Sequence, residues 1–200
     1  MIETPDVRRL VEGTRNGDQE AFKAIYECYG SRIYNFLFRL LGSRSEAEDA
    51  TQQTFLIALN RIGTLRDPTH LESWIYRIAR NEVYQKYRRK QLSSLDDEDS
   101  KAVAKRTEDR QLGSHPEKVL LNEELREALQ AALGTLPLKL REVFLLAVVD
   151  EMSYQDISEI VGRSLLSVKT DIYRARLMAK ERLSRYIGAS KNISMRRSGM

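Results

Sequence analysis

Apolar residues recur at helical spacing along most of the chain, whereas the alternating pattern of a strand is hard to find anywhere. The spacing predicts two successive helices broken around Gly30, a third helix from Glu46 to about Ile62, and a long helix from about Leu71 to Lys90. Ser43 or Ser45 is placed to cap the third helix. The first part of the chain is therefore expected to form a block of four core helices.

The helical spacing fades between Gln91 and Lys118, where serines, an acidic run and Pro116 take its place. This composition is typical of a linker. The spacing returns near Asn122, and Pro137 stands where a further helix is expected to begin. We therefore predict an all-α protein in which two small helical domains are joined by a flexible linker.

The end of the second block has the pattern of a helix-turn-helix. Ser153 and Asp156 form a start like a capping box, apolar residues follow at helical spacing, and Gly162 supplies the left-handed turn that ends this helix. The next helix, from about Leu165 to Leu183, turns apolar residues to its neighbours and cationic residues outward. Helix pairs of this kind also occur in ordinary bundles, so packing without DNA binding stays open at this point.

Positive charge is concentrated in this last part of the chain. From Gly162 to the C-terminus there are ten Lys or Arg residues against Asp171 and Glu181, a net charge of +8, whereas the whole chain of 200 residues has a net charge of +4. The excess lies where a phosphate backbone would contact a helix-turn-helix. The charge distribution therefore favours DNA binding over helix packing alone.

The composition and motifs of the chain favour a small helical protein without enzymatic activity. With 42% hydrophobic and 31% charged residues, the chain suits small helical cores rather than disorder. The two histidines, His70 and His115, fall in predicted loops, and the chain has no nucleophile elbow, P-loop or spacing of metal ligands. We therefore expect no catalytic residues, no metal and no cofactor.

The same residues indicate a cytoplasmic protein. The N-terminus lacks the apolar core of a signal peptide, and the longest purely apolar run, Val143 to Val149, is far too short to span a bilayer. Cys28 is the only cysteine, which excludes a disulfide framework within the chain and suits a reducing compartment. We therefore expect no membrane insertion.

Several segments form a family pattern through their order and separation. They are residues 48–55 (EDATQQTF), residues 74–81 (WIYRIARN), Leu136-Pro137 with residues 141–144 (REVF), the helix after Ser153, and Val168-Lys169 with residues 173–176 (YRAR). In these segments the chain resembles the extracytoplasmic-function (ECF) sigma factors, the two-domain initiation subunits of bacterial RNA polymerase. The resemblance implies core RNA polymerase and promoter DNA as partners, and an anti-sigma factor is a further candidate partner.

The resemblance also implies a division of the chain. Residues 1–92 correspond to sigma region 2, which binds core polymerase and recognises and melts the promoter −10 element. Residues 93–117 correspond to the flexible linker, and residues 118–187 to sigma region 4, whose helix-turn-helix reads the −35 element. Residues 188–200 are expected to be a disordered basic tail. The protein would direct polymerase to specific promoters, and polymerase would supply the chemistry.

Three sets of site residues follow from the resemblance. The polymerase-binding set is Asp49, Gln52 and Gln53. The set for the −10 element is His70, Arg77, Arg80, Asn81, Tyr84 and Arg88. The set for the −35 element is Arg163, Ser167, Lys169, Thr170, Tyr173, Arg174 and Arg176, of which Ser167, Lys169 and Thr170 are expected near base edges.

Some residues have simpler interpretations or depart from the family pattern. Phe55 and Trp74 are expected to be core residues rather than contacts with a partner. Leu166 stands where the family usually has glycine, and Gln85 replaces a common acid. Asp171 either accepts a hydrogen bond from a cytosine amino group or pairs with a Lys or Arg along its helix.

Two other classes of function remain open from the sequence. The chain could be an autonomous regulator that binds duplex DNA through its C-terminal domain without polymerase. It could also be an interaction protein whose basic surfaces are masked by a regulator. The sequence further leaves open whether the two domains pack together in the free protein, an arrangement that would hide DNA-binding surfaces until polymerase separates them.

Overall fold

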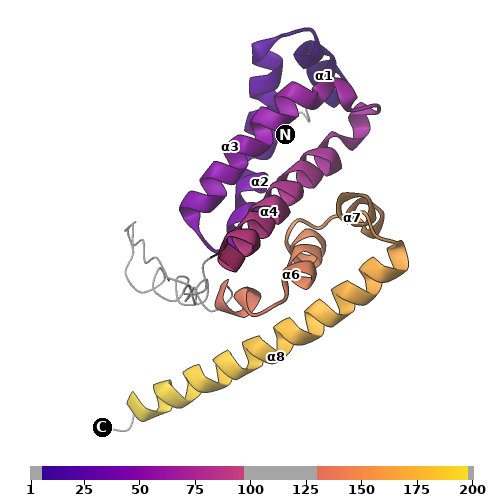
Figure 1. The fold of residues 1–200 in the computed structure, drawn as a ribbon. Helices are drawn as coiled ribbons and strands as arrows, with labels where there is room; N and C mark the ends of the chain where they lie inside the picture. The colour runs from indigo at the N-terminus through magenta and orange to yellow at the C-terminus, as the bar shows by residue number, and fades with distance from the viewer. Residues whose placement is uncertain (1–5, 97–129, 198–200) are drawn as a thin grey trace.

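A computed structural model describes residues 6–96 and 130–197 of the chain. Within these ranges the protein consists of helices and their connections, with no strand, which confirms the predicted all-α class (Figure 1). We refer to residues 6–96 as the N-terminal block and to residues 130–197 as the C-terminal block. Most of the predicted linker, residues 97–117, lies outside the described ranges.

The N-terminal block contains four α-helices and two short 3-10 turns. These are α1 (Val7–Arg15), α2 (Gln19–Leu41), α3 (Arg44–Arg61), η1 (Ile62–Thr64), η2 (Pro68–His70) and α4 (Leu71–Asp96). The Ser43 side chain accepts a hydrogen bond from the Glu46 amide, so the expected cap of α3 is confirmed. The sequence reading missed α1, which Asp6 caps and which buries Val11 in the core.

The predicted break at Gly30 is wrong, because α2 runs through it as one helix. A glycine inside a helix costs only about 1 kcal/mol relative to alanine. Ile25, Ile33 and Phe36, on either side of Gly30, are each buried, so the core holds both halves of α2 on one face. The helix ends instead at Gly42, which has a left-handed backbone with φ of 77°.

The C-terminal block is built around the helix-turn-helix. Residues 130–134 are helical and are followed by α6 (Leu138–Phe144), a π-helical turn η3 (Leu145–Val149), α7 (Tyr154–Val161) and α8 (Leu165–Arg197). Ser153 caps α7 by accepting from the Asp156 amide, and Gly162 ends it with φ of 64°. Both predicted boundaries of the first helix are therefore confirmed.

Two helices are longer than predicted. α4 continues to Asp96, into the expected linker, and α8 continues to Arg197, through most of the tail that was expected to be disordered. Neither extension contains a proline, and Gly188 alone interrupts the helix formers of α8 only weakly. Because each further residue adds a backbone hydrogen bond to an existing helix, both helices propagate past the point where apolar spacing ends.

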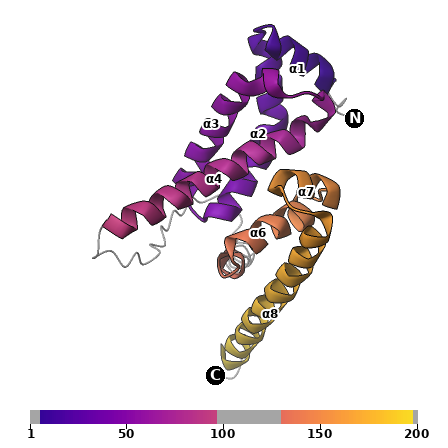
Figure 2. The ribbon, with the colours of Figure 1, turned by 45° about the vertical axis from the view of Figure 1, so that its right-hand side comes forward.

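The two blocks pack against each other. Their buried apolar residues form one cluster, and α6 and α7 lie between α4 and α8 (Figures 1 and 2). Arg141 of α6 donates from Nη1 to the Leu40 carbonyl at the end of α2, at 2.8 Å. Gln130 donates from Nε2 to the Arg39 carbonyl of the same helix, at 3.3 Å. These contacts answer the question that the sequence left open.

Candidate polymerase and DNA interfaces

One face of α3 is exposed and carries the predicted polymerase-binding residues. Asp49, Gln52 and Gln53 are all exposed at spacings that place them on the same side of the helix. The opposite side, with Ala50 and Thr54, is buried. The structure therefore brings the three predicted residues together on a surface that a partner can reach.

Two leucines extend this face, and sequence reasoning missed them. Leu56 is 49% exposed and Leu59 is 42% exposed, although both are large apolar residues. Leu56 lies seven residues after Asp49, which places it two turns along the same helix face, and this spacing was the available signal. Phe55, by contrast, is buried and packs edge-to-face on Tyr26 with 4.8 Å between ring centroids, so its expected core role is confirmed.

The residues predicted to contact the −10 element fall into two environments on α4. Arg77, Asn81 and Arg88 are exposed along one face of the helix. Arg80 and Tyr84 lie at the edge of that face and are half-buried against the C-terminal block, with the Arg80 guanidinium 4.2 Å from the centre of the Tyr84 ring. Only the first group is accessible to DNA in this arrangement.

His70 and Trp74 are two further residues of the N-terminal block whose roles were considered from the sequence. His70, at the end of η2, is exposed, and its Nδ1 lies 3.5 Å from Oε2 of Glu159 on α7. This contact joins the two blocks. Trp74 is buried, which confirms its expected place in the core.

The outer face of α8 carries most of the residues predicted for the −35 element. Lys169, Thr170, Tyr173, Arg174 and Arg176 are all exposed. The opposite face, which includes Val168, Ile172 and Ala175, is buried against the rest of the block. Ser167 is half-buried, and its amide donates to the Ser164 hydroxyl at 3.3 Å, at the start of the helix.

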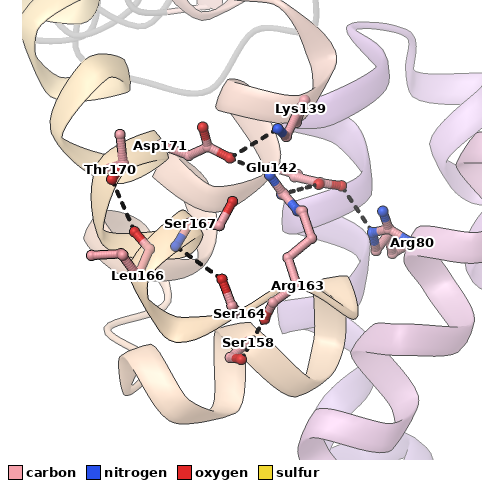
Figure 3. Close-up of polar contacts among 10 residues, drawn as sticks. All are labelled: Arg80, Lys139, Glu142, Ser158, Arg163, Ser164, Leu166, Ser167, Thr170 and Asp171. Atoms are coloured by element: carbon pink, nitrogen blue, oxygen red, sulfur yellow. Dashed lines mark hydrogen bonds and ion pairs between the residues drawn. The ribbon is translucent and has the colours of Figure 1, made fainter.

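An ionic network occupies the remaining predicted residue, Arg163 (Figure 3). Its Nη2 lies 2.7 Å from Oε1 of Glu142, and its Nη1 bonds Oδ2 of Asp171. Lys139 reaches the same Asp171 oxygen at 3.3 Å. Arg80, from the other block, completes the network with Nε at 3.0 Å from Oε2 of Glu142. Asp171 is thus buried and paired with cations, but its partners lie on α6 and in the turn before α8, not along its own helix as the second of the two roles expected.

Glu142 is the centre of this network and is completely buried. Burial raises the pKa of its carboxyl, although the Arg80 and Arg163 guanidinium groups and the Tyr84 hydroxyl act in the opposite direction. Burial, reinforced by the charge of Glu142, also raises the pKa of Tyr84 to about 12. Arg80, Tyr84 and Arg163 are therefore engaged around one carboxylate and do not face solvent as a DNA-binding surface would.

Comparison with known proteins decides what these surfaces belong to. The Sigma-70 region 2 family matches residues 25–92, and the Sigma-70, region 4 family matches residues 126–178. The ECF RNA polymerase sigma factor SigW of Bacillus subtilis is 31% identical over 180 residues, which cover 88% of this chain and 96% of that protein. This chain belongs to the ECF sigma factors of RNA polymerase.

Further relatives agree with this assignment. The ECF RNA polymerase sigma-E factor of Haemophilus influenzae is 29% identical over 189 residues, covering 92% of this sigma factor and 98% of that protein. The sigma factor RpoE from Bartonella quintana, solved in complex with the anti-sigma factor NepR, has the same fold with a TM-score of 0.68 and 24% identity, covering 82% of this chain and 96% of that one. CnrH, solved with the cytosolic domain of CnrY, gives a TM-score of 0.66 at 21% identity, covering 90% and 99%.

The family matches lie inside the predicted regions 2 and 4, whose outer boundaries stay predictions. In the part of the sigma factor that the structure describes, no three His, Cys, Asp or Glu side chains are grouped to hold a metal ion. No described helix combines the length and the apolar character that a membrane crossing requires.

Asp150 gives the contact between the blocks a dependence on pH. Burial raises the pKa of Asp150 to about 6, although Arg32 and Arg39 of α2 act in the opposite direction; Tyr76 and Glu72 of α4 also face it. The folded state binds the proton of the Asp150 carboxyl more tightly than the unfolded state does. The stability that this protonation contributes is therefore fully present below about pH 4 and is lost as the pH rises through about 6.

The variant Asp150→Asn is expected to remove this dependence. Relative to wild type it should gain about 1–2 kcal/mol in unfolding free energy at pH 7 and nothing at pH 4, a range kept small because Asp150 is partly exposed. Urea unfolding of both proteins at the two pH values measures the difference. An equal offset between the proteins at both values would contradict this prediction.

Proposed function

We propose that this sigma factor binds core polymerase through Asp49, Gln52 and Gln53 of α3, with Leu56 completing the contact. The observation that carries the proposal is that each matched region presents its own exposed set of the expected residue types. Polar groups around an apolar centre are typical of a protein interface. Arg77, Asn81 and Arg88 of α4 are assigned to the −10 element, where cations track the strand and an amide reads a base edge.

The −35 element is assigned to the outer face of α8. A recognition helix lies in the major groove with its first residues at base edges, and Lys169 is placed for this role. Arg174 and Arg176 lie further along the helix, where phosphate contacts give affinity without sequence information. The chemistry of transcription is left to polymerase, so no catalytic residue is assigned to this chain, and we place the protein in the cytoplasm with polymerase.

Four of the residues predicted to contact DNA, Arg80, Tyr84, His70 and Arg163, are engaged by other residues in this structure, so their role in DNA binding depends on a change of arrangement. In the arrangement that the structure shows, in which the two blocks are packed together and which we call closed, these four residues bind other residues of the sigma factor. His70, Arg80 and Tyr84 do so across the contact between the blocks, with Glu159 and Glu142 as their partners. We infer that polymerase binding separates α7 from α4 and releases Arg80 and Tyr84 for promoter DNA. An anti-sigma factor that holds the closed arrangement would be a matching partner for this chain.

Transcription with core polymerase tests the proposed function. Fragmented DNA from the source genome is transcribed with the purified chain, and the transcripts are sequenced. Discrete starts that share an upstream and a melted element are expected, and Asn81→Ala should weaken the preference at the melted element alone. If polymerase gains no promoters while the chain alone retains specific duplexes, it acts as an autonomous regulator instead.

Separation of the two blocks can be measured with spin labels. Cys28 is the only cysteine and is exposed on α2, so it pairs with a second label at Ser184→Cys, which is exposed on α8. Core polymerase is expected to lengthen the distance between the labels. Arg80→Ala removes a contact between the blocks and should lengthen part of the population without polymerase, whereas Arg77→Ala should not. An unchanged distance on adding polymerase would overturn the opening step.

A further inference from the structure

The second residue of the recognition helix is an unusually exposed leucine. Leu166 is 76% exposed, the highest value among the large hydrophobic residues that the structure describes. Figure 3 shows it on the side of α8 that faces away from the ionic network around Glu142. The next residues of the same stripe, Thr170 and Tyr173, are also exposed. Leu166 therefore projects from the part of the helix that would enter a groove first.

One polar neighbour of Leu166 is already engaged within the helix. The Thr170 hydroxyl donates its proton to the Leu166 carbonyl at 2.9 Å, so that donor is already used within the helix. The leucine side chain itself has neither a donor nor an acceptor. Any contact that the Leu166 side chain makes with DNA would thus be apolar.

Among the base pairs, apolar contact in the major groove selects one feature. Thymine alone presents a methyl group there, whereas the other bases present hydrogen-bond donors and acceptors at their edges. The first residues of a recognition helix are those that reach base edges. A single exposed leucine elsewhere on the surface would need no explanation, but its place at the start of this helix gives it a chemical partner.

We propose that Leu166 is a specificity-determining residue that contacts the 5-methyl group of a thymine in the upstream promoter element. This inference rests on the proposed function, in which α8 reads that element. It also predicts a recognition preference that a glycine at this position, usual in the family, would not give.

Replacing thymine by uracil isolates the methyl group, because the two bases differ in nothing else. Polymerase with the bound chain first selects duplexes from a library randomised over the upstream element, and each thymine of the selected element is then replaced in turn by deoxyuridine. At one position the loss of the methyl should weaken wild-type binding about fourfold, the factor that burial of one methyl-sized group gives. Leu166→Ala should bind the two duplexes equally.

The controls separate this contact from folding and from other roles. Leu166→Ala is an exposed change to the best helix former, so the helix should persist, and circular dichroism checks it. Leu177→Ala removes another exposed leucine, further along α8, and should keep the wild-type discrimination. If Leu177→Ala lost the discrimination between thymine and uracil, a contact specific to Leu166 would be contradicted.

Other results would also overturn the proposal while leaving the proposed function intact. They are a selected element without thymine, no discrimination against uracil by the wild type, and full discrimination retained by Leu166→Ala. Weaker assembly of Leu166→Ala with polymerase would overturn it as well, because the residue would then belong to a protein interface. Failure of polymerase to select any element with this chain would instead overturn the proposed function itself.

Discussion

Replacing Asp49 and Gln52 together by alanine is expected to weaken binding of this sigma factor to core polymerase about 100-fold. Both side chains are exposed on one face of α3, so their removal leaves the fold intact. Truncating one partner of a desolvated polar contact commonly costs more than 1 kcal/mol, and each 1.4 kcal/mol is tenfold in affinity. Titration of labelled chain with core polymerase measures the change.

Glu27 provides a charge-matched control for this prediction. It is exposed and carries the same charge as Asp49, but it lies on α2 and not on α3. Glu27→Ala should therefore bind polymerase as wild type does. Equal losses in Glu27→Ala and the double variant would mean that net charge acts rather than this face, and wild-type affinity of the double variant would remove α3 from the interface.

Leu56 is expected to form the apolar centre of this face. An exposed leucine beside polar groups is buried at little cost when a partner covers it, whereas a charged side chain at the same place would have to give up its hydration. The case for the two exposed leucines of α3 rests on their exposure in this chain and not on the resemblance to the family.

Features set by neighbouring residues could be predicted from the sequence. The cap at Ser153 and the left-handed Gly162 follow from local hydrogen bonding and backbone sterics, and both were found where expected. The outward face of α8 follows in the same way from helical spacing. The break at Gly30 failed because packing on both sides of a glycine outweighs its weak local preference.

Features set by distant residues could not be predicted. Helical spacing shows that Arg80 lies off the apolar stripe of α4, but it cannot show that a second block covers the same position. The partner of Arg80 is Glu142, 62 residues further along the chain and in the other block. Arg163 was likewise expected to contact the −35 element because its charge is visible in the sequence, whereas its two buried carboxylate partners are not.

Glu142→Ala is expected to lower the free energy of unfolding by about 3–5 kcal/mol, because it leaves two guanidinium groups without their shared buried carboxylate. Glu142 is completely buried, and Arg80 and Arg163 are each only 18% exposed at the side chain, so water cannot fully replace the lost partner. Urea unfolding measures the change. Lys139→Ala removes a more exposed member of the same network, 56% accessible at the side chain, and should cost less than about 1 kcal/mol.

Urea unfolding of two further variants, Glu142→Gln and Arg80→Ala, reports on the coupling between the blocks. Glu142 binds Arg163 within its own block and Arg80 across the interface, so its loss weakens both the C-terminal block and the contact with α4. Wild type is expected to unfold in one transition and Glu142→Gln, which keeps the side-chain shape, in two, with the C-terminal block first. Arg80→Ala keeps the Glu142–Arg163 pair and should separate the transitions with a smaller loss of stability. If Arg80→Ala and Glu142→Gln both keep a single transition, the two blocks are held together by their apolar contacts and not by this carboxylate.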